Sequence, residues 1–275
     1  MSKFKKFILV AILSLIYSGA SLCFADDPAP LSNILNLNTQ YIPSEAVTKK
    51  DLFADIRPKA IRQAARTLGT QSGAKWRYDE IQKVIEKINN EKDLLGRVYD
   101  FKNLLLHDGR VLPPVIVTAK SSIKIESNLS AVETGTSYRI LQPAKMVGNA
   151  PSWRNFLCSN AFTVAKVHEQ VLPKKENSEE IEIWKKGCRE GWAIGVEQAD
   201  TFFEQQLRKL DRVVLGIVEF NLLECQGLVS LPSVSEGHYA VRVGEKNLDI
   251  NQRTFRINRS SRFQSVQKWV PLGAK

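Results

Sequence analysis

Cysteine and histidine are the residue types that could act as nucleophiles, bases or metal ligands, and the sequence holds four cysteines and three histidines. A cysteine reacts as the thiolate, so it needs a nearby base or cation that lowers its pKa. Cys188 lies four residues from Trp184 and from Trp192, which places all three on one face of a helix. The adjacent cations Lys185 and Arg189 point elsewhere. We therefore expect Cys188 to be a buried thiol or one half of a disulfide.

The other candidates form no catalytic or metal-binding motif. His107, His168 and His238 are scattered, and no pair of cysteines has the spacing of a zinc site. His168 precedes Glu169 in a helix-like segment, where a surface position is the simpler interpretation. The sequence also lacks a phosphate-binding glycine loop, a nucleophile elbow and a zinc-protease motif. We expect no enzymatic activity, no catalytic residue, no metal, no cofactor and no small-molecule substrate.

The first residues predict export. Three lysines within the first six positions precede eleven uncharged residues, 7–17, and small residues follow. This is the layout of a secretory signal peptide. The apolar run is shorter than the roughly 20 residues that a membrane-spanning helix needs. We expect residues 1–25 to be a signal peptide.

The end of this signal allows two kinds of processing. Small residues at positions 23 and 25 fit cleavage after Ala25, which would leave Asp26 as the new N-terminus. Alternatively, Cys23 is the acylated cysteine of a lipoprotein, and the acyl chains would anchor the protein to a membrane. The bulky Leu22 stands where the lipoprotein pattern requires a small residue. Both alternatives stay open.

Charge and the remaining cysteines restrict the partners only weakly. The net charge is +10, without a block of five like charges, which fits a soluble surface with spread charges. Nucleic-acid binding is not expected, because few aromatic residues accompany the C-terminal arginines. These arginines are Arg242, Arg253, Arg256, Arg259 and Arg262. After the signal, the odd number of cysteines leaves the pairing of Cys158, Cys188 and Cys225 undetermined.

Helix and strand patterns alternate irregularly along the chain. Residues 26–50 are polar and rich in proline, which predicts an extended arm that docks onto its own body or a partner through Leu31, Ile34, Leu35 and Leu37. Apolar periodicity predicts helices over 55–68, ended by Gly69, over 78–107 with a break at Gly96, over 152–172, and, with a break, from a cap at Asn177 or Ser178 to about Glu224. Alternating residues predict strands within about 112–147 and 227–270.

This order favours an α+β fold, with a helix-rich body and a small, mostly antiparallel sheet. We expect residues 51–275 to form a single domain.

One long predicted helix carries a stripe of small residues. Gly187, Gly191, Gly195 and Ala199 recur every four positions. Each glycine costs about 1 kcal/mol in a helix interior, so the stripe needs a compensating contact. Small residues allow another backbone to approach closely. We expect a helix-packing stripe, whose partner is either the same chain or another subunit.

Several segments in order along the chain carry a further pattern. They are residues 57–65 (RPKAIRQAA), 69–73 (GTQSG), 101–105, 112–116 (LPPVI), 151–157 (PSWRNFL), 172–174, the positions Gly191-Trp192, Gly195 and Gln198-Ala199, and 269–271 (WVP). Together they resemble the DotC family of the Dot/Icm type IVB secretion system, which has relatives in conjugation systems. The resemblance spans nearly all of the chain after the signal.

The resemblance implies a non-enzymatic structural subunit of an outer-membrane core complex. It implies DotD-like and DotH-like partners, self-association in a ring-shaped complex and a periplasmic, outer-membrane-associated location. Members of the family are typically lipoproteins, which bears on Cys23. The competing hypothesis is an exported enzyme or ligand-binding protein, which would require a deep pocket with convergent side chains.

Overall fold

The computed structural model describes residues 28–38, 56–127, 130–158, 162–244, 246–265 and 267. The predicted signal peptide, with Cys23, Ala25 and Asp26, lies outside these residues. Contacts divide the chain into two units. The first unit contains the described residues up to Val98 together with Leu157–Gln206, and the second contains Tyr99–Phe156 and the residues from Leu207 onward.

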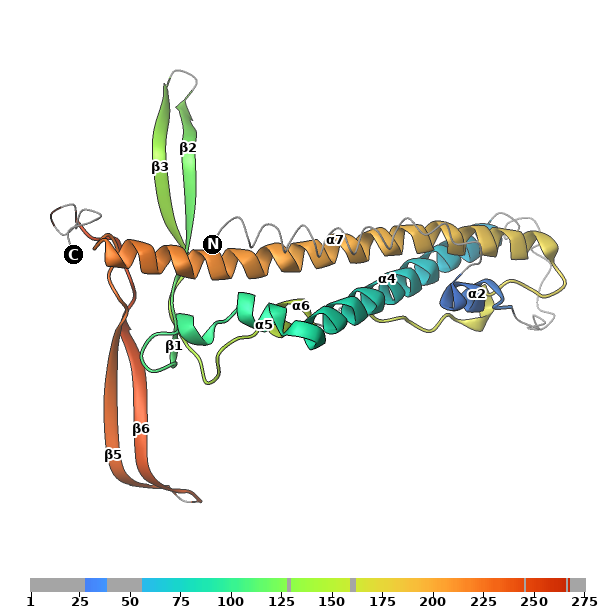
Figure 1. Cartoon of the computed structure of the whole chain (residues 1–275). Coiled ribbons are helices and arrows are strands. Elements are labelled where there is room, and N and C mark those ends of the chain that lie inside the picture. Colours follow the sequence, from blue (N-terminus) through green and yellow to red (C-terminus); the bar gives the residue numbers. More distant parts are fainter. Residues whose placement is uncertain are drawn as a thin grey trace. The chain divides into compact units, whose positions relative to one another are not determined.

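The first unit is helical. It contains α2 (Ala29–Leu35), α4 (Ile56–Lys92), α5 (Leu94–Val98), the short 3-10 helix η2 (Glu169–Val171) and the first part of α7 (Ser178–Cys225). Helix α4 runs beside α7 in the same direction (Figure 1). Two ion pairs agree with this parallel arrangement. Arg57 contacts Glu180 and Arg77 contacts Asp200, and in both pairs the acidic residue lies 123 positions after the arginine.

Helix α4 is continuous where we predicted two helices. Gly69 lies inside it, so the prediction that Gly69 ends a helix was wrong. Glycine is tolerated there because the backbone of Cys188 occupies the space that a side chain would need. The actual break comes at Asp93, whose φ of 43° lies in the left-handed region, and not at Gly96.

The predicted arm contains a short helix. Pro28 and Pro30 flank the start of α2, where proline costs no backbone hydrogen bond. Leu31, Ile34 and Leu35 are buried among residues of α4 and α7, whereas Leu37 is exposed. The indole N–H of Trp184 donates to the Ile34 carbonyl at 2.8 Å. These contacts dock α2 onto the body of its own chain.

The helix expected over residues 152–172 is mostly absent. Only α6 (Arg154–Leu157) and η2 are helical within that range, and residues 162–168 have no regular structure. This segment lies against α4 and α7 instead. The N–H of Ala165 donates to Gln71 Oε1 of α4 at 2.9 Å, and Phe162 packs on Tyr78 of α4 and Phe202 of α7. Contacts with these two helices thus replace the internal hydrogen bonds of a helix.

The second unit combines the last part of α7 with three two-stranded antiparallel sheets. Strand β1 (Val111–Leu112) pairs with β4 (Lys145–Met146), β2 (Val115–Ser127) with β3 (Ser130–Gln142), and β5 (Ser233–Val243) with β6 (Leu248–Arg259). The unit also contains the short 3-10 helix η1 (Lys102–Leu104). The predicted α+β class is therefore confirmed, with the strands in separate sheets.

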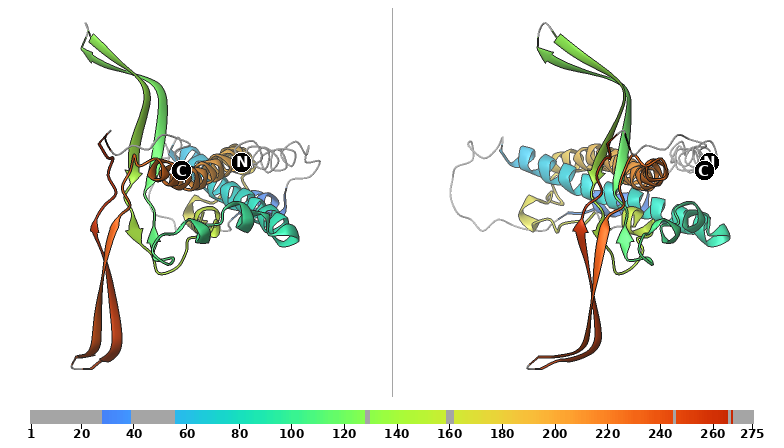
Figure 2. Two further views of the ribbon diagram at one scale, coloured as in Figure 1. Left: turned by 60° about the vertical axis from the view of Figure 1, so that its left-hand side comes forward. Right: turned by 90° about the vertical axis from the view of Figure 1, so that its left-hand side faces the viewer.

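Two of these sheets are long hairpins. In Figures 1 and 2, β2–β3 and β5–β6 both extend away from the last turns of α7. Among the described residues, the contacts that anchor each hairpin lie at its base. Ile116 at the base of β2 is buried with Phe220 and Leu223 of α7, and the Arg110 guanidinium lies 4.3 Å from the ring centroid of Phe255 in β6.

Helix α7 has 48 residues and lacks the break that we expected. Its first part belongs to one unit and its last part to the other. Asn177 caps it, because its side-chain oxygen accepts from the N–H groups of Glu179 and Glu180 at 3.1 and 3.2 Å. Past its end, Gly227 adopts φ 71°. Within the described residues, no helix is both long enough and apolar enough to cross a membrane.

Candidate functional site

Among the described residues, the histidine and cysteine side chains that could act in catalysis or bind a metal do not lie together. His168 and His238 are exposed on separate elements, and His107 is exposed with its Nε2 3.3 Å from the carbonyl of Pro232. Among the described residues, no three histidine, cysteine or acidic side chains are grouped so that they could hold a metal ion. Cys158 and Cys225 are exposed.

Cys188 is a free thiol in the core of the first unit. It is fully buried between Trp184 and Trp192, as their shared helix face predicts. Burial raises the pKa of this thiol to about 12, because the apolar surroundings disfavour the thiolate. At neutral pH the side chain is therefore a small apolar core residue and not a nucleophile.

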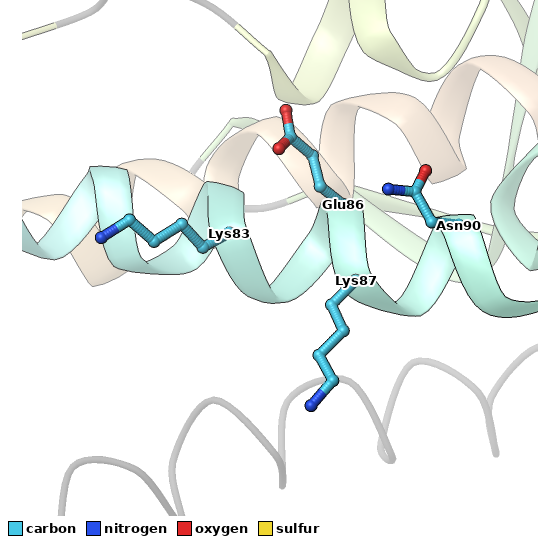
Figure 3. Close-up of a pocket in the computed structure, with 4 residues that line it drawn as sticks. All are labelled: Lys83, Glu86, Lys87 and Asn90. Atoms are coloured by element: carbon cyan, nitrogen blue, oxygen red, sulfur yellow. The ribbon is translucent and has the colours of Figure 1, made fainter.

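The side chains that line two surface pockets of the described residues do not point toward a common reaction centre. One hollow is lined by Lys83, Glu86, Lys87 and Asn90, all from α4. Figure 3 shows these side chains leaving one helix in different directions. Lys83 is engaged with Glu80 at 2.8 Å along the same helix. A second hollow, also on α4, is lined by Gln63, Arg66, Thr67, Thr70 and Gln71.

The small-residue stripe of α7 faces α4. A Cβ on Gly187 would lie 2.9 Å from the Ala65 Cβ, and one on Gly191 would lie 2.9 Å from the backbone nitrogen of Thr70. A Cβ on Gly195 would lie 2.7 Å from the nitrogen of Ala74. Real Cβ atoms do not approach other atoms this closely, so these positions exclude any side chain.

Helix α4 contributes glycines of its own to this contact. A Cβ on Gly73 would lie 2.6 Å from the carbonyl oxygen of Trp192, and Gly69 faces the backbone of Cys188. Ala199, the last member of the predicted stripe, is fully buried beside Ala74 and Tyr78. The stripe thus lies against the chain's own helix, and both helices supply small residues to the contact.

Charged pairs border the same contact. Arg57 donates to Glu180 from Nε at 2.7 Å and from Nη2 at 3.1 Å, and the Lys174 N–H adds a third bond to this carboxylate. Burial by itself would raise the pKa of Glu180, but the hydrogen bonds from Arg57 and Lys174 outweigh burial, so the net pKa is lowered. Arg77 and Asp200 form a second pair at 2.7 Å.

The second unit exposes apolar residues on its hairpins in addition to those that it buries. We define the tip face as five side chains at the end of the β5–β6 hairpin that are each more than half exposed. They are Tyr239, Val241, Val243, Leu248 and Ile250, with exposed fractions of 51, 58, 76, 61 and 65%. Val241 lies opposite Ile250 and Val243 opposite Leu248, so alternation places all five on one face.

Two smaller exposed apolar surfaces lie in the same unit. Ile123 and Ile125 of β2 are 67 and 76% exposed. Leu215, Val218 and Leu222 of α7 are spaced by three and four residues, so they form an exposed stripe on one side of the helix. Unpartnered apolar surfaces of this kind mark sites of protein or membrane contact.

The five C-terminal arginines are all exposed. Arg253 pairs with Glu236 and lies 5.5 Å from the ring centroid of Phe255. Arg256 is exposed between Phe255 and Ile257, which are half-buried, as expected of a strand with one solvated face.

Sequence reasoning missed the tip face. The alternation of residues 239–243 and 247–250 predicted strands, without showing that their apolar side is exposed. The available signal was the scarcity of further strands, since two strands cannot cover their own apolar face.

Comparison with protein families gives one result. Residues 55–271 match the model of a family described as type IV secretory system, conjugal DNA-protein transfer. No curated protein matches the chain. Because the match covers most of the sequence, the chain belongs to this type IV secretory system family.

Proposed function

We propose, from this family membership, that the chain is a non-enzymatic structural subunit of the outer-membrane core complex of a type IVB secretion system. It would be exported, lie at the periplasmic side of the outer membrane and help to place partner subunits there. A lipid on Cys23 would anchor it. DotD-like and DotH-like proteins and further copies of this chain are the proposed partners, and the secretion system itself would carry the exported cargo.

One observation carries the structural part of this proposal. The second unit presents hairpins whose apolar side chains are exposed, whereas the polar side chains of the described residues converge on no reaction centre. An enzyme needs acid, base or nucleophile groups within reach of one substrate. A subunit that functions by contact needs exposed, partly apolar surface. The described residues fit the second requirement.

Fractionation of cells that express the whole secretion system tests the proposal. We expect the chain to sediment with the outer membrane and to co-purify with other secretion subunits in a large complex. Deleting its gene should stop transfer and leave the partner subunits mislocalised. Recovery of the chain as a free periplasmic monomer in such cells, or normal transfer without it, would overturn the proposal.

Mass spectrometry of the purified chain tests the anchor separately. An acylated N-terminal Cys23 predicts membrane retention after the complex is dissociated. An N-terminus at Asp26 predicts release into the soluble fraction under the same conditions.

A further inference from the structure

The tip face of the β5–β6 hairpin has the composition of an interface centre. Four of its five apolar side chains form two directly opposed pairs, Val241 with Ile250 and Val243 with Leu248. The neighbouring position on this face is Gln252, opposite Tyr239, so the face carries no charge. The charged residues Arg242 and Asp249 lie opposite each other in the strand register, on the other face. Depletion of charge is typical of the buried centre of a protein interface.

This hairpin end also lacks internal support. A two-stranded hairpin alone is marginally stable in water, and it needs a further strand or a packed face to become independently stable. The described contacts of β5–β6 with other elements lie toward its base, where the Arg110 guanidinium lies over the ring of Phe255. Just beyond the base, Val229 pairs with Phe263. Nothing among the described residues covers the tip face, since its side chains are 51 to 76% exposed.

We infer that the tip faces of two copies of this chain pack against each other. The inference rests on the proposed role as an assembly subunit and names the surface for self-association. At these exposed fractions the tip face leaves on the order of 500 Å² of apolar surface in water, near the upper end for the largest patch of a monomer. Two such faces in contact bury about 1,000 Å², which reaches the lower limit of specific protein interfaces.

A second copy fits this face better than a lipid bilayer does. A hairpin has two open edges, and backbone N–H and C=O groups at an open edge cannot be satisfied in hydrocarbon. Two apposed hairpins keep these edges in water and bury only the uncharged faces. The contact is isologous, because the same surface is used on both copies, and it closes after two copies. A ring of copies would therefore also use another surface.

The test uses the full chain, purified after the expressing cell has processed its N-terminus. Analytical ultracentrifugation over a concentration series should show a monomer–dimer equilibrium for the native chain. The double variant Val241→Ser, Ile250→Ser should raise the Kd by about tenfold or more, because each buried methylene contributes to the contact. The matched control is Arg242→Ser, Asp249→Ser, the next pair along the hairpin on the opposite face. Its Kd should stay within about threefold of the native value.

Hydrogen exchange of the native chain gives a readout that needs no variant. Amides of residues 239–252 should gain protection as concentration rises, while those of β2–β3 should not. A native chain that stays monomeric throughout, an equal loss of dimer in both double variants, or protection at β2–β3 alone would overturn the inference. A monomeric chain that still co-purifies with other secretion subunits would overturn this inference and leave the proposed function standing.

Discussion

Replacing Gly191 by alanine should destabilise the first unit, although alanine is the better helix former. The new Cβ would lie 2.9 Å from the Arg66 carbonyl carbon and 2.9 Å from the Thr70 nitrogen. Both atoms belong to the α4 backbone, which cannot rotate away as a flexible side chain would. The two helices must therefore separate, and neighbouring contacts such as those of Gly187 and Gly195 would loosen with them.

Two opposing effects determine the magnitude. Exchange of an interior helical glycine for alanine stabilises a helix by about 1 kcal/mol. Forcing extra atoms into a closely packed contact costs about 1–3 kcal/mol, and a backbone obstacle places this site at the upper end. The expected net loss is about 2 kcal/mol, which corresponds to a thermal midpoint lower by about 4–8 °C for a unit of this size.

Differential scanning calorimetry and hydrogen exchange of α4 and α7 measure this loss. Ala193→Gly is the matched control, because Ala193 is exposed on the same stretch of α7 and reports helix propensity alone. That control should lose about 1 kcal/mol. If Gly191→Ala instead raised the stability by about 1 kcal/mol, propensity would dominate and the close-approach argument would be refuted.

Three further predictions concern single side chains. Glu180→Gln should destabilise the first unit by about 1.5–3 kcal/mol at pH 7, because it removes a charged hydrogen bond to Arg57. The pKa of Glu180 is lowered from 4.5, so this stability is present above about pH 4.5 and is lost as the pH falls through the folded pKa; unfolding curves of both proteins should converge in acid. Tyr99→Phe should cost about 1–3 kcal/mol in chemical denaturation of the second unit, because the buried Tyr99 hydroxyl donates to a carboxylate at 2.7 Å. Cys225 should react quickly with a thiol reagent at neutral pH, whereas Cys188 should react only after unfolding; rapid labelling of Cys188 in the native chain would contradict its burial.

Local patterns predicted much of the secondary structure. The 3.6-residue period located α4 and α7, and alternation located β2, β3, β5 and β6. Of the two residues predicted as possible caps of α7, Asn177 is the cap. These features depend on neighbouring residues, so a single sequence contains their signal. The same reasoning placed Trp184 and Cys188 on one buried face.

Features that depend on distant contacts were not predictable in this way. Gly69 was predicted to end a helix because a glycine inside a helix costs stability unless a close backbone contact compensates. Here the contacting backbone belongs to Cys188, far along the chain. Residues 162–168 are not helical although their pattern predicted a helix, and they contact Gln71 and Phe202 instead. The exposure of Val243 and Leu248 could not be read from alternation, which marks an apolar face without showing what covers it.

Different residues determine the distance between α4 and α7 and the register of the two helices. Small residues repeated every four positions would fit equally well after a slip of four residues, so the glycines set how close the helices lie but leave their sliding position ambiguous. The ion pairs Arg57–Glu180 and Arg77–Asp200 share one offset of 123 residues, and a slip would break both together. The ion pairs thus fix the register of the two helices, whereas the glycines permit several registers.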